Sequence, residues 1–381
     1  MDIAFKKKAE EFVSCLPYKQ TPYRNRNWGH PWHSLCSYHG KLKPAIAHWL
    51  ISEFTSEGDV VLDPLCGVGT IPFEACLQGR VGIGNDLSEL AYVVTKAKVE
   101  KPNYSGVEDV ICQLDDYIKN NKGSKSITDY EDFGFNGKLP QYFEPETYKE
   151  ILCARDFFLN RFSSISPEEA MVFSALLHVL HGNRPYALSR HSHPLTPYAP
   201  TGEFEYKSVI EKVVQKVNAS YAKLEQSQIT RGRAVYGDYK DLAAKNIKAD
   251  FIICSPPFAD SIRFYMQNWM RLWLCGWEPK DYKKADEKFL DKLQEKNFDL
   301  YYSFFEMCAD VLNDNGKVIL HLGKTKTTDM GAELSKRAGS WFDLVYLAGE
   351  DVRTIEKHGI KDKGVTVEHQ YLFLQKKMRW D

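Results

Sequence analysis

The sequence lacks several features that would exclude a cytoplasmic enzyme. No run approaches 18 consecutive apolar residues, so a membrane-spanning helix is not expected. Residues 1–19 are charged and contain no apolar core of the signal-peptide type. The nine cysteines form no Cys-x-x-Cys pair, and the histidines fit no finger spacing, which argues against a zinc site or a disulfide framework. We therefore expect a cytoplasmic protein with free thiols and no bound metal.

The chain also lacks an excess of charge of either sign. Its formal net charge is −1 over 381 residues, of which 43% are hydrophobic, so a substantial core is expected. Nucleic-acid-binding proteins are often basic overall, and a partner of that kind would therefore need a local basic patch here. The length favours two domains.

Alternating strands and helices characterise the region that follows residue 44. Residues 44–56 have helical spacing, and residues 59–63 and 81–86 are short apolar runs of the buried-strand type. Helices are expected at 70–79, where Thr70 is a candidate cap, and at 87–99. This order predicts the opening of a doubly wound α/β, Rossmann-like sheet.

The alternation then breaks and returns later in the chain. Residues 168–181 and 206–229 have helical spacing, which predicts a mainly helical insertion between the second and third strands. We divide the chain into a catalytic domain, residues 1–102 and 232–381, and an inserted domain, residues 103–231, expected to recognise the target.

The remaining segments complete the expected catalytic domain. Residues 1–30 are mixed and polar and are interpreted as a lead-in arm. Strands are predicted at 234–238, 251–254 and 317–322, the last preceded by a tight turn at 314–316, and at 342–347 and 365–375, which would form a hairpin.

The turn after the first predicted strand has the composition of a ligand-binding loop. Asp63 ends the strand, and Gly67 and Gly69 allow a sharp turn and a close approach to a ligand. Asp86 ends the second strand, where an acid accepts hydrogen bonds from ribose hydroxyls. A dinucleotide site would need a third glycine and no acid facing the phosphates, so the pattern favours a cationic ligand such as S-adenosylmethionine. A glycine-rich turn with an incidental acid is the alternative.

The third predicted strand ends in Asp238 and Tyr239. At that edge of the sheet, Asp238 could accept a hydrogen bond from an adenine amino group, and Tyr239 could pack on the ring. A solvated turn acid is the alternative reading of Asp238.

The tetrad Ser255-Pro256-Pro257-Phe258 follows a buried strand, at the sheet edge where ligands bind. Two prolines fix the backbone and remove two N–H donors. The hydroxyl of Ser255 and the carbonyl of Ser255 or Pro256 could then accept the two hydrogens of a base amino group and free its lone pair. Phe258 could stack on the base, which would have to be flipped out of a duplex. A rigid strand-to-helix turn is the alternative.

At these residues the chain resembles the family of amino-methyltransferases that modify cytosine N4 or adenine N6 in DNA. The segment Asp63 to Thr70 resembles the family's donor-binding motif, and Ser255 to Phe258 resembles its catalytic tetrad, in which serine is typical of the cytosine-N4 branch. The segment from His33 to Pro44 resembles the part that closes over the methionine end of the donor. The resemblance implies a site-specific DNA methyltransferase that uses S-adenosylmethionine. The donor-contacting residues that we expect are Tyr38, Lys41, Asp63, Pro64, Cys66, Gly67, Gly69, Thr70, Asp86, Leu87, Asp238, Tyr239 and Cys254.

The inserted region and the segment after the tetrad carry the candidate nucleic-acid contacts. Residues 184–240 contain nine lysines and arginines against five acids. Arginine grips phosphate and guanine edges, and tyrosine stacks on unpaired bases. The candidates are Arg184, Tyr186, Arg190, His191, His193 and Arg263, with Tyr265, Asn268 and Arg271 as further residues of the substrate mouth. A solvated loop and an ordinary amphipathic helix are the alternatives.

Three other functions stay open on the sequence. The modified base could be adenine N6, or the substrate could be RNA, because the Asp63 turn also resembles those of guanine-N2 enzymes. The fold could instead serve as a non-catalytic recognition subunit of a defence complex. The preferred partner is double-stranded DNA, and a restriction endonuclease or defence-system partner is compatible with it.

Overall fold

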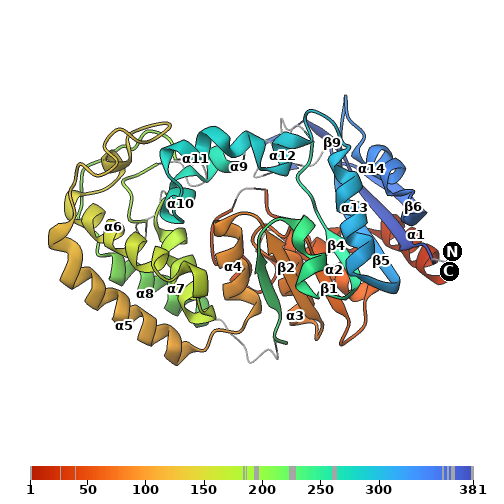
Figure 1. Cartoon of the computed structure of the whole chain (residues 1–381), viewed down its shortest axis with the longest axis horizontal. Helices are drawn as coiled ribbons and strands as arrows, with labels where there is room; N and C mark the ends of the chain where they lie inside the picture. The colour runs from red at the N-terminus through yellow and green to blue at the C-terminus, as the bar shows by residue number, and fades with distance from the viewer. Residues whose placement is uncertain are drawn as a thin grey trace.

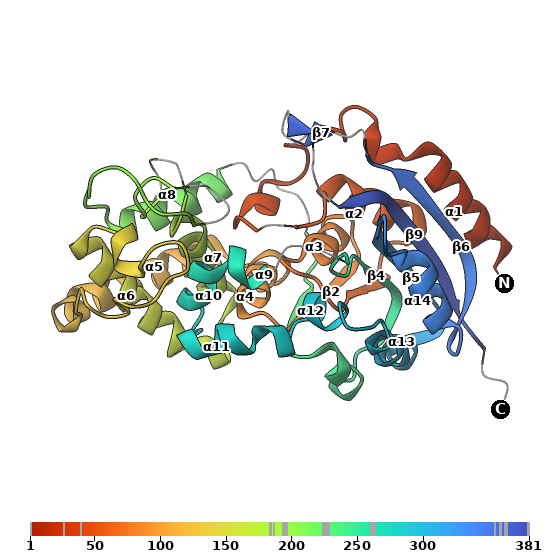
Figure 2. The same ribbon diagram turned by 90° about the horizontal axis from the view of Figure 1, so that it is seen from above.

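The computed structural model contains a mixed sheet flanked by helices, with a helical group at one end of an elongated molecule (Figures 1 and 2). The described residues are 2–25, 27–38, 40–182, 185, 187–192, 197–222, 229–259, 264–353, 356–357, 360–361 and 365–378. In these residues, none of the helices combines the length and apolar character that crossing a bilayer requires.

The main sheet has seven strands within the described residues, in the order β3-β2-β1-β4-β5-β9-β6. Strands β1 to β5 run parallel, and β9 pairs antiparallel with both β5 and β6. The strands are β1 (Val60–Asp63), β2 (Val81–Asp86), β3 (Arg233–Tyr236), β4 (Ala249–Cys254), β5 (Leu312–Thr325), β6 (Phe342–Asp351) and β9 (Thr366–Lys376). A separate two-stranded hairpin consists of β7 (Glu356–Lys357) and β8 (Ile360–Lys361).

The helices form three groups along the chain. Those before and within the first half of the sheet are α1 (Ile3–Cys15), α2 (Pro44–Phe54), α3 (Thr70–Leu77) and α4 (Glu89–Val99). The inserted helices are α5 (Tyr104–Asn121), α6 (Pro145–Leu159), α7 (Pro167–Val179) and α8 (Val209–Tyr221). After β4 come α9 (Phe264–Gln267), α10 (Trp269–Leu274), α11 (Pro279–Lys284), α12 (Leu290–Leu293), α13 (Leu300–Val311) and α14 (Met330–Ala338).

The strand order reverses between β1 and β4. From β1 the chain adds β2 and β3 on one side, and it later adds β4 and β5 on the other. The register pairs Leu62 with Ile252, so the turns that leave β1 and β4 start next to each other. Ligands of open α/β sheets bind at such a reversal, beyond the carboxyl ends of the strands. The topology therefore brings the two turns singled out in the sequence to one place.

Alternating side chains of the strands bury both faces of the sheet. Val61 and Ile253 pack with α1 and α2 on one face, whereas Leu62 and Ile252 pack with α13 and α14 on the other. A parallel strand with both faces covered reads as a continuous apolar run. This accounts for the composition of β1 and β4 and confirms the predicted doubly wound α/β class.

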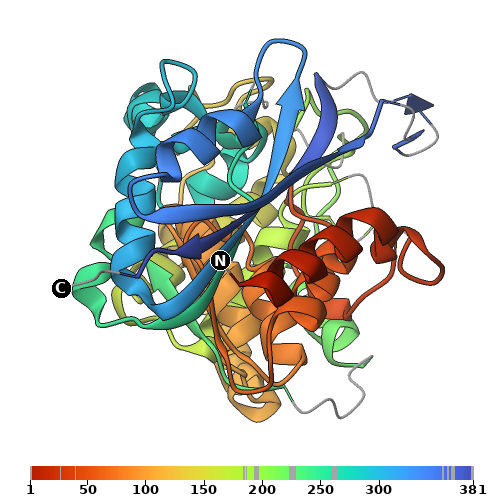
Figure 3. The same ribbon diagram turned by 90° about the vertical axis from the view of Figure 1, so that its right-hand side faces the viewer.

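Three local predictions need correction. Residues 3–15 form helix α1, which covers the sheet beside β6 (Figure 3), because Phe5 and Phe12 pack on Phe54 and Phe373. Gly69, not Thr70, is the N-cap of α3. Residues 313–316 belong to the span of β5, where they bulge out of the ladder between the pairs Ala249–Leu312 and Phe251–Lys317.

The inserted helices share a hydrophobic core with the rest of the chain. Their buried side chains join those of α4 and α10 in one continuous cluster. Figure 1 shows α9 to α12 running along one side of the molecule, from the inserted helices toward the sheet. The segment that follows the tetrad is thus packed against the insertion, which couples the two parts mechanically.

Candidate functional site

The turn after β1 has a backbone that requires glycine. Gly67 and Gly69 have φ values of +51° and +69°. A Cβ atom on Gly69 would lie 2.7 Å from Thr95 Oγ1, so α4 packs directly against this turn. The turn also leads into α3, whose first N–H groups face the same edge of the sheet.

Two carboxyl groups lie at this edge, that of Asp63 buried and that of Asp86 half-buried. Asp63 accepts a hydrogen bond from Leu65 N at 3.2 Å, and Asp86 accepts from Gly67 N at 2.8 Å and Ser88 N at 2.9 Å. Burial raises the pKa of Asp63 to about 7 and that of Asp86 to about 6, and the repulsion between the two contributes to the first. Carboxylates in this state gain from a cation or from hydroxyl donors.

Asn85 joins three neighbouring turns. Its side-chain amide donates to Pro64 O at 3.0 Å and to Gly237 O at 3.1 Å, which connects the ends of β1, β2 and β3. Within the part of the chain that the structure describes, its buried Oδ1 atom has no hydrogen-bond partner. An unpaired buried acceptor beside two carboxyls fits a ligand that carries amino and hydroxyl donors, as S-adenosylmethionine does.

The other residues that we expect to contact the donor lie at the same edge of the sheet. The Tyr38 ring lies over Gly67, where an added Cβ would be 3.4 Å from the phenol oxygen. Cys254 is buried and hydrogen-bonded to Asp63, which helps to hold that carboxyl group. The side chains of Cys66 and Thr70 are buried in the turn, Leu87 is half-buried beyond Asp86, and Pro64 offers its carbonyl to Asn85.

Asp238 and Tyr239, which follow β3, differ in their surroundings. Asp238 is half-buried at the sheet edge, where its side chain accepts from Lys240 N. Tyr239 is buried instead against α13, with its hydroxyl 3.2 Å from Ser303 Oγ and its ring against Phe304. This packing favours a core role for Tyr239 and leaves Asp238 as the candidate for adenine.

The tetrad lies beside the turn after β1, residues 64–69, which we call the donor turn. It is held by β5 and by the end of α12. Ser255 Oγ is 3.1 Å from His321 Nδ1. Gln294 Nε2 donates to Pro257 O at 3.0 Å, so that carbonyl is engaged, whereas those of Ser255 and Pro256 are the ones assigned to a substrate. Phe258 packs on Gly323, where a Cβ atom would come within 2.5 Å of the ring.

The sequence does not identify His321 and Gln294 as contacts of the tetrad. Both are buried, His321 on β5 and Gln294 just after α12. A histidine inside the apolar run of a central strand was the available signal for His321. For Gln294 the local sequence offers none, because its role depends on the packing of α12 against the tetrad.

An N-terminal strap, residues 31–38 and 40–43, is fastened over the donor turn. His33 Nε2 donates to Glu74 of α3 at 2.6 Å, and His48 Nδ1 lies 3.2 Å from the other carboxylate oxygen. Burial acts to raise the pKa of Glu74, but these hydrogen bonds outweigh it and lower the pKa to about 2. The strap that carries Tyr38 is thereby fixed to the helix that follows the donor turn.

Three lysines border this strap and the donor turn, and each is bonded to a backbone carbonyl. The bonds are Lys41 Nζ to His33 O at 2.6 Å, Lys98 Nζ to Val68 O at 2.6 Å, and Lys216 Nζ to Ser34 O at 2.9 Å. Burial lowers the pKa of all three, to about 7 for Lys98 and about 8 for Lys216. Of the three, Lys41 and Lys216 bring positive charge to the junction of the strap and α8, whereas a pKa of about 7 leaves Lys98 only partly charged at neutral pH.

The expected nucleic-acid contacts are only partly placed. Arg184, Tyr186, His193 and Arg263 lie outside the described residues. Arg190 donates to Gly202 O and Gln141 O and covers the ring of Phe204, so it clamps the loop to the insertion. His191 is exposed on that loop.

The residues proposed for the substrate mouth lie in the interior. Tyr265, Asn268 and Arg271 are all buried, and Arg271 donates to Leu177 O of α7 at 2.9 Å. Their positions favour the alternative, an amphipathic helix packed on the insertion.

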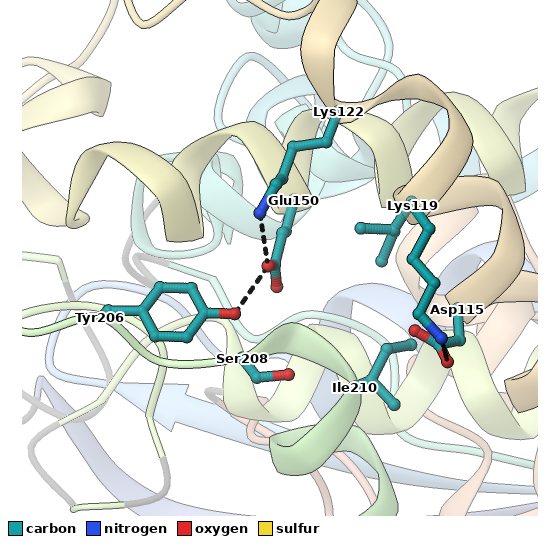
Figure 4. A pocket seen from close by; sticks show the side chains of 8 residues that line it. Asp115, Lys119, Lys122, Glu150, Tyr206, Ser208 and Ile210 are labelled. Carbon is teal, nitrogen blue, oxygen red and sulfur yellow. Dashed lines mark hydrogen bonds and ion pairs between the residues drawn. The ribbon is translucent and has the colours of Figure 1, made fainter.

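A separate cavity of about 300 Å³ is lined only by residues of the insertion. Figure 4 shows Lys122 and Tyr206 pointing toward Glu150, and Lys119 paired with Asp115. Its charged groups thus pair with one another, and the tetrad and the donor turn contribute no lining residue. Within the described part of the chain, no three His, Cys, Asp or Glu side chains gather in a way that could hold a metal ion.

The comparisons with known proteins bear on this site. Residues 31–117 match the family model described as "RMKL-like, methyltransferase domain". The chain is 26% identical over 136 residues to the Type II methyltransferase M.MjaII of Methanocaldococcus jannaschii, which covers 34% of this chain and 25% of that protein.

Two solved structures are among those that match this chain. TrmN from Thermus thermophilus is 13% identical, with 91% of this chain and 52% of that chain covered and a TM-score of 0.35. The rRNA methyltransferase aviRa from Streptomyces viridochromogenes is 9% identical, with 93% of each chain covered and a TM-score of 0.35.

The family match and the sheet topology support a Rossmann-like methyltransferase with S-adenosylmethionine as its cofactor. The chain spans a quarter of the curated relative it matches and about half of TrmN, so its own substrate has to be argued from the site.

Proposed function

We propose that this chain transfers a methyl group from S-adenosylmethionine to the exocyclic amino group of a flipped-out DNA base, with cytosine N4 as the target. The observation that carries the proposal is the adjacency of Asp63 and the Ser255 turn at the strand-order reversal. A donor site and an amino-activating site are thereby assigned to neighbouring turns. The similarity to M.MjaII, a Type II methyltransferase, is compatible with DNA as the substrate.

In this proposal, Asp63, Asp86 and Asn85 hold the cofactor. The carboxylates would receive its amino group and ribose hydroxyls, and Tyr38 would close over it from the strap. When bound, S-adenosylmethionine supplies a methyl group whose bond to sulfur breaks with the electrons left on sulfur.

The tetrad activates and positions the base. Amino groups on pyrimidine rings are poor nucleophiles because the lone pair is delocalised. Ser255 Oγ and the carbonyl of Ser255 or Pro256 would each accept one amino hydrogen, which favours a tetrahedral nitrogen with a free lone pair. Phe258, wedged against Gly323, gives the base a fixed face to stack on, and this alignment supplies much of the rate gain.

The inserted helices are proposed to contact the duplex. Lys41 of the strap and Lys216 of α8 would supply positive charge for the phosphates of the DNA backbone. Lys41 and Lys216 are bonded to backbone carbonyls, which leaves their positive charge available for phosphate. Duplex DNA is therefore the preferred partner.

Transfer of tritiated methyl groups from S-adenosylmethionine to mixed-sequence duplex DNA tests the proposal, with nucleoside analysis of the product. We expect N4-methylcytosine. Ser255→Ala should keep donor affinity, measured by calorimetry, but lose at least about 10²-fold in turnover. Label found only in RNA, or equal loss of donor binding in Ser255→Ala and Asp63→Ala, would contradict the assignment.

A further inference from the structure

The hydrogen bond between Ser255 and His321 joins the tetrad to a buried base on the neighbouring strand. β4, β5 and β9 lie side by side in the sheet (Figure 1), and the register places His321 opposite Tyr371. His321 Nδ1 is 3.1 Å from Ser255 Oγ, at the point where the sequence leaves β4. His321, which takes no part in the proposed amino activation, is therefore in direct contact with Ser255, which does.

The surroundings of His321 determine which proton it can exchange. Its ring is enclosed by Phe258, His369 and Tyr371, with centroid distances of 5.4, 4.9 and 5.2 Å. Its Nε2 atom is buried and has no hydrogen-bond partner among the described residues. The route between this imidazole and a substrate therefore runs through Nδ1 and the Ser255 hydroxyl.

We propose that His321 receives, through Ser255, the proton that the amino group releases when it is methylated. The inference rests on the proposed function. In the resting state the Ser255 hydroxyl donates to Nδ1, and the lone pairs on Oγ remain directed at the amino hydrogens. This gives Ser255 the acceptor role that amino activation requires.

The proton balance is complete within the site. The methylated nitrogen carries two hydrogens and a positive charge. One of these protons passes to Ser255 Oγ while the Ser255 proton passes to His321 Nδ1, which leaves a neutral methylamine, a neutral serine and an imidazolium. After product release the proton returns through Ser255 to water. No oxidant, metal or further reactant is needed.

A weak base suits this task. Burial lowers the pKa of His321 well below 6.5, and the neighbouring His369 adds to the effect, so the imidazole is neutral at physiological pH and ready to accept. An amino group that has just been alkylated is a strong acid, so a strong base is unnecessary. Tyr371 is the other titratable group that faces the ring, and burial raises its pKa, so it stays protonated.

Two variants separate proton transfer from simple positioning. His321→Asn keeps an acceptor near the place of Nδ1 but cannot hold the proton, whereas His321→Leu removes both functions. At saturating donor and DNA we expect kcat to fall about 10-fold in His321→Asn and about 10²-fold in His321→Leu, with donor affinity and thermal midpoint close to wild type.

The pH profile of kcat gives the decisive readout. Protonation of His321 blocks proton uptake, and because burial lowers its pKa, the wild-type kcat should have an acid limb at a pH well below 6.5, which His321→Asn should lack. A wild-type rate and an unchanged acid limb in His321→Asn would overturn the inference.

Nitrogen NMR of histidine-labelled protein tests the hydrogen bond without any turnover. The His321 signal, assigned by its loss in His321→Asn, should report an unprotonated Nδ1 that shifts in Ser255→Ala. A protonated Nδ1 in the resting protein would overturn the inference even if the enzyme methylates DNA. If wild-type protein methylates no nucleic acid while Nδ1 behaves as expected, the proposed function fails and the Ser255–His321 contact stands.

Discussion

Asp63 and Asp86 are single residues whose ionised form is disfavoured by burial. Asp63 is buried and Asp86 is half-buried at the ends of adjacent strands, and the backbone hydrogen bonds that they accept only partly offset the loss of solvation. Their raised pKa values mean that the folded protein binds protons more tightly than the unfolded chain. Their contribution to stability is therefore complete below about pH 4 and is lost as the pH rises through about 7.

Replacing Asp63 by Asn should separate stability from binding. The free energy of unfolding of the cofactor-free protein at about pH 8 should increase by on the order of 3 kcal/mol, because the buried charge is gone. Urea denaturation measures this change, and calorimetry should show that donor binding is lost. Asp343→Asn, at an exposed carboxylate on β6, should change neither quantity. A less stable Asp63→Asn protein that still binds the donor would contradict the interpretation.

At the scale of elements, the strap and α8 meet through a lysine. Lys216 of α8 reaches Ser34 O, and Lys41 of the strap reaches the preceding carbonyl, of His33. Two ammonium groups on adjacent carbonyls repel each other, which adds to the effect of burial on Lys216. An anion placed between the strap and α8 would relieve this repulsion.

Lys216→Met should therefore weaken binding of duplex DNA about 3- to 10-fold and lower the slope of log affinity against log salt by about 1. Fluorescence anisotropy over a series of salt concentrations measures both. Lys336→Met, on α14, is the matched control and should leave both unchanged. An unaltered salt slope in Lys216→Met would show that this lysine does not face the nucleic acid.

At the scale of the whole molecule, a buried arginine connects the insertion to the segment after the tetrad. Arg155 of α6 donates to Trp273 O at 2.8 Å, to Glu278 at 2.7 Å and to Tyr130 Oη at 3.0 Å. Its guanidinium also lies over the Tyr130 and Trp273 rings. Because the inserted helices also share a hydrophobic cluster with α4 and α10, the helical end and the sheet end are expected to unfold as one unit.

Arg155→Met should lower the free energy of unfolding by about 3 kcal/mol, because Glu278 and the Trp273 carbonyl lose their charged partner. Chemical denaturation monitored by tryptophan fluorescence and by far-UV dichroism should still give a single transition. Arg353→Met, which removes an exposed pair with Asp351, should have little effect. Two separate transitions in the wild-type protein would contradict the shared core.

Local sequence was sufficient for the parts of the fold that depend on neighbours in the chain. Asp63, Gly67 and Gly69 indicate the end of a strand, a turn and a close approach of the backbone to its neighbours. They do so because burial and positive φ angles restrict which residues can occupy these positions. The same holds for β4 and the rigid tetrad after it. The helical character of the insertion also follows from spacing alone, whereas the polar surface of α1 concealed the phenylalanines that it packs on the sheet.

Tertiary structure decided the roles that depend on distant partners. His321 meets Ser255 because β5 is added next to β4, and Tyr239 is buried because α13 packs on it. Arg190 donates to the carbonyls of Gly202 and Gln141. A side chain's type limits the chemistry that it can perform. Which lone pair or proton it presents is determined by strand order and helix packing, which bring together residues that are remote in the chain.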